Sequence, residues 1–332
     1  MNEVYIITEG TKKTGFGHLT RCLSLYQSFI EKKIFPFLVV HGDETSASLL
    51  EGTNHIVLNW ITQYEQLLDL LPSKSIVIID TLLADISLIE KIIIHVSHPV
   101  IIDDYKRQSY SKGIIIDWTI FSESLYQTKN LYLAGTNYVA LRKDFWNVPP
   151  KKINSVVKNI LITMGGNDIR NLTPGILYLI QEKFPDFNIR VIVGKAFTNE
   201  KEIVAKKEKN KETELLYNLN ASQMVTAFTE ADIVISAGGQ TLYELARIGT
   251  PTIAVQIIDN QKFDIEGWLK TGFIDFAGNW DDIDLRKKIS GFLNILIDDF
   301  TLRKKKSELG RKFVDGKGAE RIVTSLLDYG RK

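Results

Sequence analysis

The chain has 332 residues, of which 44% are apolar, so it is long enough for two domains with real cores. A net charge of +1 argues against nucleic-acid binding through a global basic field. The single cysteine, Cys22, excludes an internal disulfide framework and a cysteine-rich zinc site. We see no charged-then-apolar signal segment and no apolar run of membrane-span length, so we expect a cytoplasmic protein without a membrane span.

The first half of the sequence alternates short apolar runs with segments of helical periodicity, which predicts a parallel α/β domain. A continuous apolar run bounded by turns is typical of a parallel strand that is buried on both faces. We predict strands at residues 4–7, 37–40, 76–80, 100–104 and 114–117, with helices after His18, at 64–71 and at 86–94. Three of these strands end in aspartate, which is either a ligand-facing group or a common turn former and helix cap.

Residues 147–152, Asn-Val-Pro-Pro-Lys-Lys, fit neither the helical nor the strand periodicity, so we predict a linker there. After this segment the α/β pattern restarts. The sequence therefore predicts two Rossmann-like parallel-sheet domains, 1–148 and 149–332. The last helix, 318–329, packs back on the first domain in this prediction. In the second half we predict strands at 159–164, 189–194, 232–236 and a last clear strand at 252–255, and helices from 173, at 200–211, 220–230 and 241–247. The basic run Arg303 to Lys306 reads as a solvated helix face.

A glycine turn joins the first strand to the first helix, in the order Thr14-Gly15-Phe16-Gly17-His18-Leu19-Thr20-Arg21. Glycines allow the backbone to turn tightly and to approach a ligand. The N–H groups and the dipole of a new helix favour an anion there. An imidazole at this positive helix end is biased toward its neutral, base-competent form, so His18 is a candidate base. Arg21 lies three residues on, on the same helix face.

Two further glycine corners follow strands of the second half, at Gly165-Gly166 and at Gly238-Gly239. A cleft between the domains would allow all three corners to face one ligand. The Walker phosphate loop is absent. Gly15-x-Gly17-x-x-Thr20 imitates the dinucleotide fingerprint but has threonine at the third glycine position, and Asp43 would be its ribose acid, so dinucleotide binding stays a weaker alternative.

The motifs and their order resemble one family. Gly15-Phe16-Gly17-His18-x-x-Arg21, the run from Met164 to Leu172, and the stretch from Ser236 through Glu244 to Gln261 look like the UDP-sugar hydrolases of the pseudaminic acid pathway, the PseG family. The segment from Leu141 to Trp146 adds to the likeness, which spans residues 10 to 262. That family is related to the MurG-type glycosyltransferases of GT-B fold.

The resemblance implies a metal-independent enzyme without a cofactor, which hydrolyses a UDP-linked acetamido sugar at the anomeric carbon and releases UDP. His18 would activate the water, and Arg21 would add a cation if it turned into the cleft. Glu244 would hold the two ribose hydroxyls, or it could pair with Arg247 instead. The other implied substrate-binding residues are Gly15, Gly17, Gly165, Gly166, Asn167, Asp168, Gly238, Gly239, Gln240 and Thr241 for the sugar and phosphates, with Asn260 and Gln261, otherwise a plain turn, for the sugar.

The chain departs from the family at one position. The family has a tyrosine two residues after the aspartate that ends the strand at 76–80, and this chain has Leu82 there. Glycosyl transfer from a UDP-sugar donor, or noncatalytic binding of a sugar nucleotide, therefore remain open. If a metal were required, Asp80, Asp103 and Asp104 would be the first ligands to test. The sequence does not fix the sugar or the oligomeric state.

Overall fold

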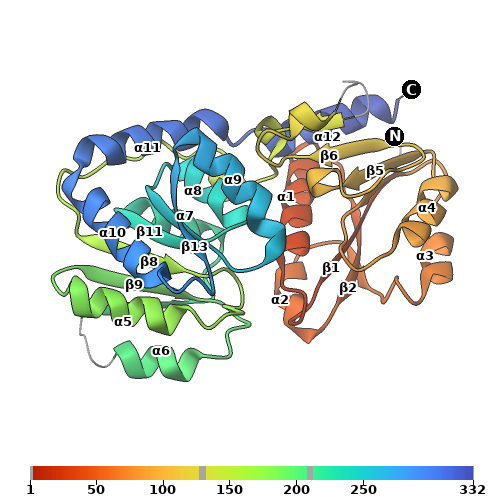
Figure 1. Ribbon diagram of the computed structural model, residues 1–332. Coiled ribbons are helices and arrows are strands. Elements are labelled where there is room, and N and C mark those ends of the chain that lie inside the picture. Colours follow the sequence, from red (N-terminus) through yellow and green to blue (C-terminus); the bar gives the residue numbers. More distant parts are fainter. Residues whose placement is uncertain (1–2, 127–131, 208–211, 332) are drawn as a thin grey trace. The chain divides into compact units, whose positions relative to one another are not determined.

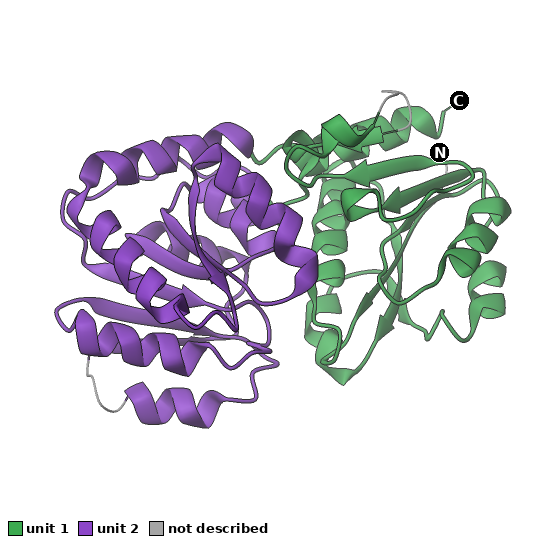
Figure 2. Ribbon diagram, in the orientation of Figure 1, with its two compact units in different colours: residues 1–143, 316–332 green, residues 144–315 purple. Residues whose placement is uncertain are grey.

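The computed structural model describes residues 3–126, 132–207 and 212–331. These residues form two compact units (Figures 1 and 2). Unit 1 comprises residues 1–143 and 316–332, and unit 2 comprises residues 144–315. Each unit is an α/β layer structure built on one parallel sheet. The chain thus leaves unit 1, completes unit 2, and returns to unit 1 with its last helix.

Unit 1 is a sheet of seven parallel strands in the order β3-β2-β1-β4-β5-β6-β7. Its strands are β1 (Val4–Gly10), β2 (Phe37–Gly42), β3 (His55–Val57), β4 (Ile76–Ile79), β5 (His98–Ile102), β6 (Ile114–Asp117) and β7 (Tyr132–Ala134). Its helices are α1 (Gly17–Glu31), α2 (Ala47–Leu50), α3 (Tyr64–Leu70), α4 (Ile86–His95) and α12 (Gly318–Tyr329).

Alternating side chains of the central strands pack against helices on the two faces of this sheet. Ile7, Ile79 and Ile101 join a buried cluster with Leu88 and Ile92 of α4. Helix α12 packs against α1 in the other layer, which ties the end of the chain to unit 1. Because β4 and β5 are buried on both faces, they read in the sequence as unbroken apolar runs.

Unit 2 is a sheet of six parallel strands in the order β10-β9-β8-β11-β12-β13. Its strands are β8 (Asn159–Thr163), β9 (Asn188–Val193), β10 (Thr213–Tyr217), β11 (Ile233–Ala237), β12 (Thr252–Gln256) and β13 (Ile274–Asn279). Its helices are α5 (Thr173–Lys183), α6 (Glu200–Lys207), α7 (Ala221–Glu230), α8 (Gln240–Ile248), α9 (Lys262–Thr271), α10 (Leu285–Asp298) and α11 (Phe300–Phe313). Helices α5 and α10 share one buried cluster with β8 and β11, while α11 packs on α8.

The structure confirms the two parallel-sheet domains and corrects parts of the sequence prediction. The strand at 252–255 is not the last, because β13 follows it and pairs with β12. The predicted helix 200–211 is described as far as Lys207, and residues 208–211 lie outside the described residues. None of the helices in the described part of the chain is long and apolar enough to cross a membrane.

The basic run from Arg303 to Lys306 on α11 was predicted to be solvent-exposed, but two of its side chains are buried. Arg303 is 1% exposed and donates hydrogen bonds to the carbonyls of Leu296 and Asn154 at 2.6 and 2.9 Å. Lys306 is 4% exposed and pairs with Asp275 at 3.0 Å. The sequence reading failed here because buried cations are rare, and they are stable only when backbone carbonyls or carboxylates surround them.

The division between the units falls after Lys143, and the predicted boundary was after residue 148. The difference has a visible cause in the side chain of Arg247 on α8. Its guanidinium donates hydrogen bonds to the carbonyls of Phe145, Trp146 and Val148 at 2.9, 2.7 and 3.1 Å. The proline-containing segment that reads as a linker is therefore bound to unit 2.

The end of α8 gives a test of this packing. Gly249 stops the helix with φ 87° and ψ 35°, in the left-handed region. A Cβ there would lie 2.5 Å from Ser307 Oγ of α11. We predict that Gly249→Ala lowers the free energy of unfolding by at least ~1–2 kcal/mol, measured by urea denaturation.

The matched control is Gly291→Ala, in the exposed middle of α10, where a Cβ meets nothing within 4 Å. That substitution is expected to stabilise the protein by ~0.5–1 kcal/mol, because alanine is the better helix former. Equal effects of the two substitutions would contradict the contact between α8 and α11.

Candidate functional site

Each sheet has one point at which the strand order reverses, and the connections on its two sides run in opposite directions. In unit 1 this point lies between β1 and β4, and in unit 2 it lies between β8 and β11. Ligands of parallel α/β sheets bind outside the carboxyl ends of the strands at such points. All three glycine corners of the sequence follow strands that flank these points: β1 in unit 1, and β8 and β11 in unit 2.

The corner after β1 is a tight turn that leads into α1. Gly15 has φ 79°, and its N–H donates to the Thr11 carbonyl at 2.8 Å. Helix α1 begins at Gly17 without a side-chain cap, which places His18 in its first turn. A Cβ added at Gly15 or Gly17 would meet nothing within 4 Å, so the backbone here borders open space. The expected strand, glycine turn and helix are therefore present.

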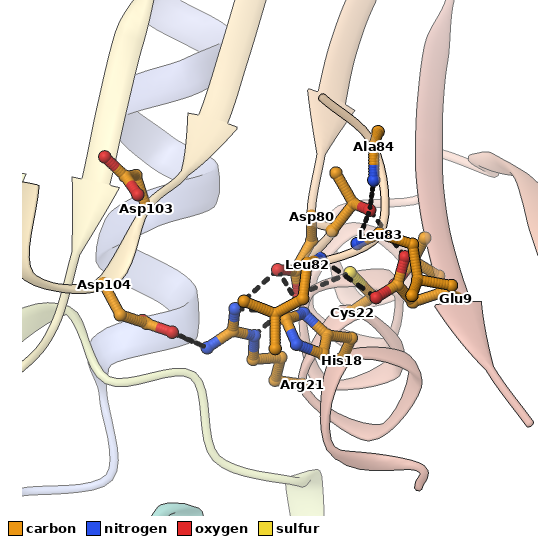
Figure 3. Close-up of polar contacts among 12 residues, drawn as sticks. Glu9, His18, Arg21, Cys22, Asp80, Leu82, Leu83, Ala84, Asp103 and Asp104 are labelled. Carbon is orange, nitrogen blue, oxygen red and sulfur yellow. Dashed lines mark hydrogen bonds and ion pairs between the residues drawn. The ribbon is translucent and has the colours of Figure 1, made fainter. Parts of the chain in front are cut away.

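The central side chain of the site is Asp80, directly after β4 (Figure 3). It is fully buried, and its oxygens accept hydrogen bonds from His18 Nδ1 at 2.7 Å and from Arg21 Nε and Nη2 at 2.6 and 2.5 Å. The Cys22 thiol lies 3.5 Å from Oδ2. Burial alone would raise the pKa of Asp80, but the charges of Arg21 and His18 and their hydrogen bonds hold it well below its ordinary value.

This ionised carboxylate determines which nitrogen of His18 carries the proton. Two groups lie near His18 Nδ1, the Asp80 Oδ1 atom at 2.7 Å and the Arg21 Nη2 atom at 3.2 Å. The shorter contact is to an ionised carboxylate, which can only accept hydrogen bonds, so Nδ1 is the protonated nitrogen. The Nε2 atom of the neutral ring then has its lone pair available, as a general base requires. Among the described residues, Nε2 has no protein partner, and the His18 side chain is 14% exposed.

Arg21 is enclosed within unit 1. Besides Asp80, its Nη1 atom reaches both oxygens of Asp104 at 3.1 and 2.7 Å, and its guanidinium lies 5.2 Å from the ring centroid of Trp118. The residue is 8% exposed. The sequence made Arg21 a cation for the substrate on the condition that it turned into the cleft, and its guanidinium contacts two carboxylates of its own unit.

A second buried carboxylate fixes the loop after β4. Glu9 on β1 is 1% exposed and accepts hydrogen bonds from the Thr81 hydroxyl at 2.5 Å and from the Leu82 N–H at 2.9 Å. The Thr81 hydroxyl accepts from Leu83 and Ala84 N–H in turn. Leu82, at the position where the resembled family has a tyrosine, is therefore held by its backbone, and the residue is 50% exposed.

The remaining aspartates at this edge have partners of their own. Asp103 accepts from Arg107 Nε at 2.9 Å, and burial raises its pKa. Burial, with the charge of Asp104, raises the pKa of Asp117 to about 6. Within the described ranges, no group of three or more His, Cys, Asp or Glu side chains could hold a metal ion. Asp80, Asp103 and Asp104, the fallback metal ligands of the sequence reading, face arginines.

At the corner after β8 the glycines border open space, while the aspartate is hydrogen-bonded to backbone N–H groups. Gly165 has φ 77°, and a Cβ at Gly165 or Gly166 would meet nothing within 4 Å. Asn167 beside them is half-buried. Asp168 is 5% exposed, and its oxygens accept from the Leu172 and Thr173 N–H groups, both at 2.9 Å. These bonds join Asp168, a predicted substrate-binding residue, to the start of α5.

The side chain of Gln261 fixes the glycine corner after β11 through two hydrogen bonds. Its Oε1 accepts from the Ile257 N–H at 2.9 Å, and its Nε2 donates to the Gly238 carbonyl at 3.1 Å. Gly239 has φ 91° and precedes α8, which has no side-chain cap. Gln261, a predicted sugar-binding residue, is 7% exposed, and its two hydrogen bonds position the glycine corner.

The other predicted residues of unit 2 lie around the start of α8. Gln240 and Thr241 are half-buried in its first turn, and Asn260 is exposed. Glu244, one turn further, is 5% exposed. The alternative pairing of Glu244 with Arg247 has no support in the contacts of Arg247, whose guanidinium binds the backbone carbonyls of residues 145, 146 and 148.

Asp43 does not have the place that a ribose-binding acid needs. Its Oδ1 accepts from the Thr45 N–H at 3.0 Å, where it caps a short 3-10 turn, and its Oδ2 accepts from the Lys12 N–H at 2.9 Å. These bonds hold the corner after β1 to the end of β2. The observed geometry therefore gives Asp43 a structural role and weakens the dinucleotide alternative.

Sequence reasoning found His18 but not its partner Asp80, and it missed Glu9. Asp80 follows a buried apolar run, as Asp103 and Asp117 do, so the local pattern does not single it out. The distinguishing signal is the strand order, because β4 lies beside β1 and brings residue 80 to the start of α1. Strand order depends on long-range pairing, which one sequence does not reveal.

Comparison with known proteins gives distant relatives. Residues 159–262 match the glycosyltransferase family 28 C-terminal domain. The chain is 28% identical over 288 residues to the uncharacterized protein MJ1062 of Methanocaldococcus jannaschii, covering 81% of this chain and 58% of that protein. It is 25% identical to the spore coat polysaccharide biosynthesis protein SpsG of Bacillus subtilis, covering 98% of each. It is 24% identical to the pseudaminic acid cytidylyltransferase and UDP-2,4-diacetamido-2,4,6-trideoxy-beta-L-altropyranose hydrolase of Helicobacter pylori, covering 89% of this chain and 53% of that protein.

Among solved structures, MurG of Acinetobacter baumannii superposes with a TM-score of 0.68 at 12% identity, covering 98% of this chain and 99% of that chain. The MnaA–UDP co-structure of S. aureus superposes with a TM-score of 0.70 at 15% identity, covering 99% and 97%. Likeness at this level of identity shows the fold. The chain therefore has the GT-B type fold, with two parallel-sheet α/β domains.

Proposed function

We propose that this protein hydrolyses a UDP-linked acetamido or diacetamido deoxysugar at its anomeric carbon, releasing UDP and the free sugar for nonulosonic acid or surface polysaccharide biosynthesis. The observation that carries the proposal is the hydrogen bond between His18 Nδ1 and ionised Asp80, which leaves Nε2 as the base. The distant likeness to the H. pylori hydrolase, which covers 89% of this chain, supports the choice of reaction.

The proposed step begins with His18 Nε2 taking a proton from a water molecule while the water oxygen bonds to the anomeric carbon. The bond between that carbon and the β-phosphate oxygen breaks, and UDP leaves with the electron pair. Asp80 stabilises the imidazolium that forms, as the carboxylate does in other histidine–aspartate pairs. The proton then passes from His18 to solvent or to the departing diphosphate. In this step His18 is the base, and Asp80 orients its ring and stabilises its positive charge.

Unit 2 binds the UDP part in this proposal. The uncapped start of α8 offers N–H groups and a positive dipole end to phosphate oxygens. The glycines at 165, 166 and 239 allow a ligand to approach the backbone, because a side chain at 165 or 166 would fill open space. Glu244 accepts hydrogen bonds from both ribose hydroxyls. The co-structure of MnaA with UDP has the same overall fold.

Glycosyl transfer from a UDP-sugar is the second candidate, and the match of residues 159–262 to the glycosyltransferase family 28 C-terminal domain favours it. His18 would then deprotonate an acceptor hydroxyl in place of water. Candidate UDP-sugars incubated with and without acceptor separate the two reactions. UDP release in water alone supports hydrolysis, and release only with acceptor supports transfer. If UDP-sugars bind and no UDP is released, the protein is a noncatalytic binder.

We predict that His18→Gln lowers turnover ~10²–10⁴-fold, the usual contribution of a general base, while UDP affinity stays within about twofold. UDP release under saturating substrate and calorimetry with UDP measure the two quantities. His55→Gln, on exposed strand β3, is the control and should keep full turnover. Full activity of His18→Gln would refute the assignment of the base.

Glu244→Gln should weaken UDP binding roughly 10–100-fold, because the substitution replaces two charge-assisted hydrogen bonds to the ribose. Inorganic pyrophosphate, which has no ribose, should bind the variant and the native protein equally. Glu266→Gln on the surface of α9 is the matched control. If both ligands lose affinity to the same extent, Glu244 supports the fold of unit 2 and does not read the ribose.

A further inference from the structure

We propose that Arg21 and Asp104 are positioning residues, which hold Asp80 in one orientation and one ionisation state so that His18 keeps its proton on Nδ1. This inference rests on the proposed function of His18 as the base. Both residues act on His18 through Asp80, and Arg21 Nη2 also lies 3.2 Å from His18 Nδ1. The observation behind it is the continuous contact from Asp104 through Arg21 and Asp80 to His18 (Figure 3).

The first step concerns orientation. Arg21 meets Asp80 with two parallel donors, Nε to Oδ2 at 2.6 Å and Nη2 to Oδ1 at 2.5 Å. Such a two-point contact fixes the plane of the carboxylate as well as its position. The same Oδ1 atom accepts from His18 Nδ1 at 2.7 Å. Rotation of Asp80 would therefore break the bond that orients the imidazole.

The second step concerns ionisation. Asp80 has no exposed surface, and without a cation its burial would favour the protonated carboxyl group. A protonated carboxyl can donate a hydrogen bond to Nδ1, and the ring would then carry its proton on Nε2. That tautomer has no lone pair on the side needed for base catalysis. Arg21 prevents this state, because its charge keeps Asp80 an acceptor.

The third step concerns the far side of Arg21. Asp104, after β5, binds Nη1 with both oxygens and has 27% of its side chain exposed. The charged or titratable groups in the contact network are His18, Arg21 and Cys22 from α1, Asp80 after β4 and Asp104 after β5. With His18 neutral the cluster has one net negative charge, and it becomes neutral when His18 takes a proton. Asp104 thus gives Arg21 a second carboxylate partner and holds its guanidinium beside Asp80.

The test measures the tautomer directly, by ¹⁵N NMR of the histidine rings in the whole chain of 332 residues. The variant His18→Gln assigns the signal. The native protein should show Nδ1–H. Arg21→Lys keeps the charge but loses the two-point contact, so we expect a mixture of tautomers, with kcat reduced at least 10-fold and KM within about twofold. Arg107→Gln is the control, because it removes the neighbouring Arg107–Asp103 pair and should leave the His18 tautomer unchanged.

Asp104→Asn is the second variant, at a partly exposed position where folding is at less risk. It should give a mixed tautomer and a several-fold lower kcat in a protein that still unfolds in one cooperative transition, with a melting temperature lowered by the loss of the Arg21–Asp104 pair. If Arg21→Lys and Asp104→Asn both fold and keep the native tautomer and kcat, the proposal is overturned. If the native protein shows the Nδ1–H tautomer and its loss in both variants but releases no UDP, the positioning role stands and the proposed hydrolysis falls.

Discussion

The orientation of His18 depends on one buried negative charge. Asp80 has no contact with solvent, yet it stays ionised because Arg21 and His18 surround its oxygens with donors. A buried carboxylate without such partners would be neutral or would destabilise the fold. The carboxylate therefore requires Arg21, Arg21 requires Asp104, and the orientation of His18 follows from both. The site is a consequence of charge compensation at a strand end.

In unit 2 the buried polar side chains at the glycine corners form hydrogen bonds to the backbone and fix its conformation, whereas those around His18 in unit 1 bind one another. Asp168 caps the start of α5, and Gln261 joins the corner after β11 to the end of β12. These bonds leave the glycine backbone of the two corners uncovered, which is the form that suits a phosphate group. In the proposed reaction, unit 2 holds the nucleotide through backbone and Glu244, and unit 1 supplies the base.

Much of this fold follows from the sequence. Parallel strands buried on both faces give unbroken apolar runs, and glycine turns before helices are local, so His18 and three corners could be identified. Two classes of feature could not. Asp80 becomes a partner of His18 only through the pairing of β4 with β1, a contact between distant segments. Arg303 and Lys306 are buried although their residue types predict exposure, because carbonyl groups of other segments receive them.

The central claim is that water attacks the anomeric carbon, and the fate of oxygen tests it most directly. A UDP-linked diacetamido deoxyhexose is incubated with the protein in ¹⁸O-labelled water, and the released UDP is analysed by mass spectrometry. Phosphate oxygens do not exchange with water on this time scale. The account predicts UDP without ¹⁸O, because the bond between carbon and oxygen breaks. UDP that carries ¹⁸O would show attack at phosphorus and would contradict the role assigned to His18.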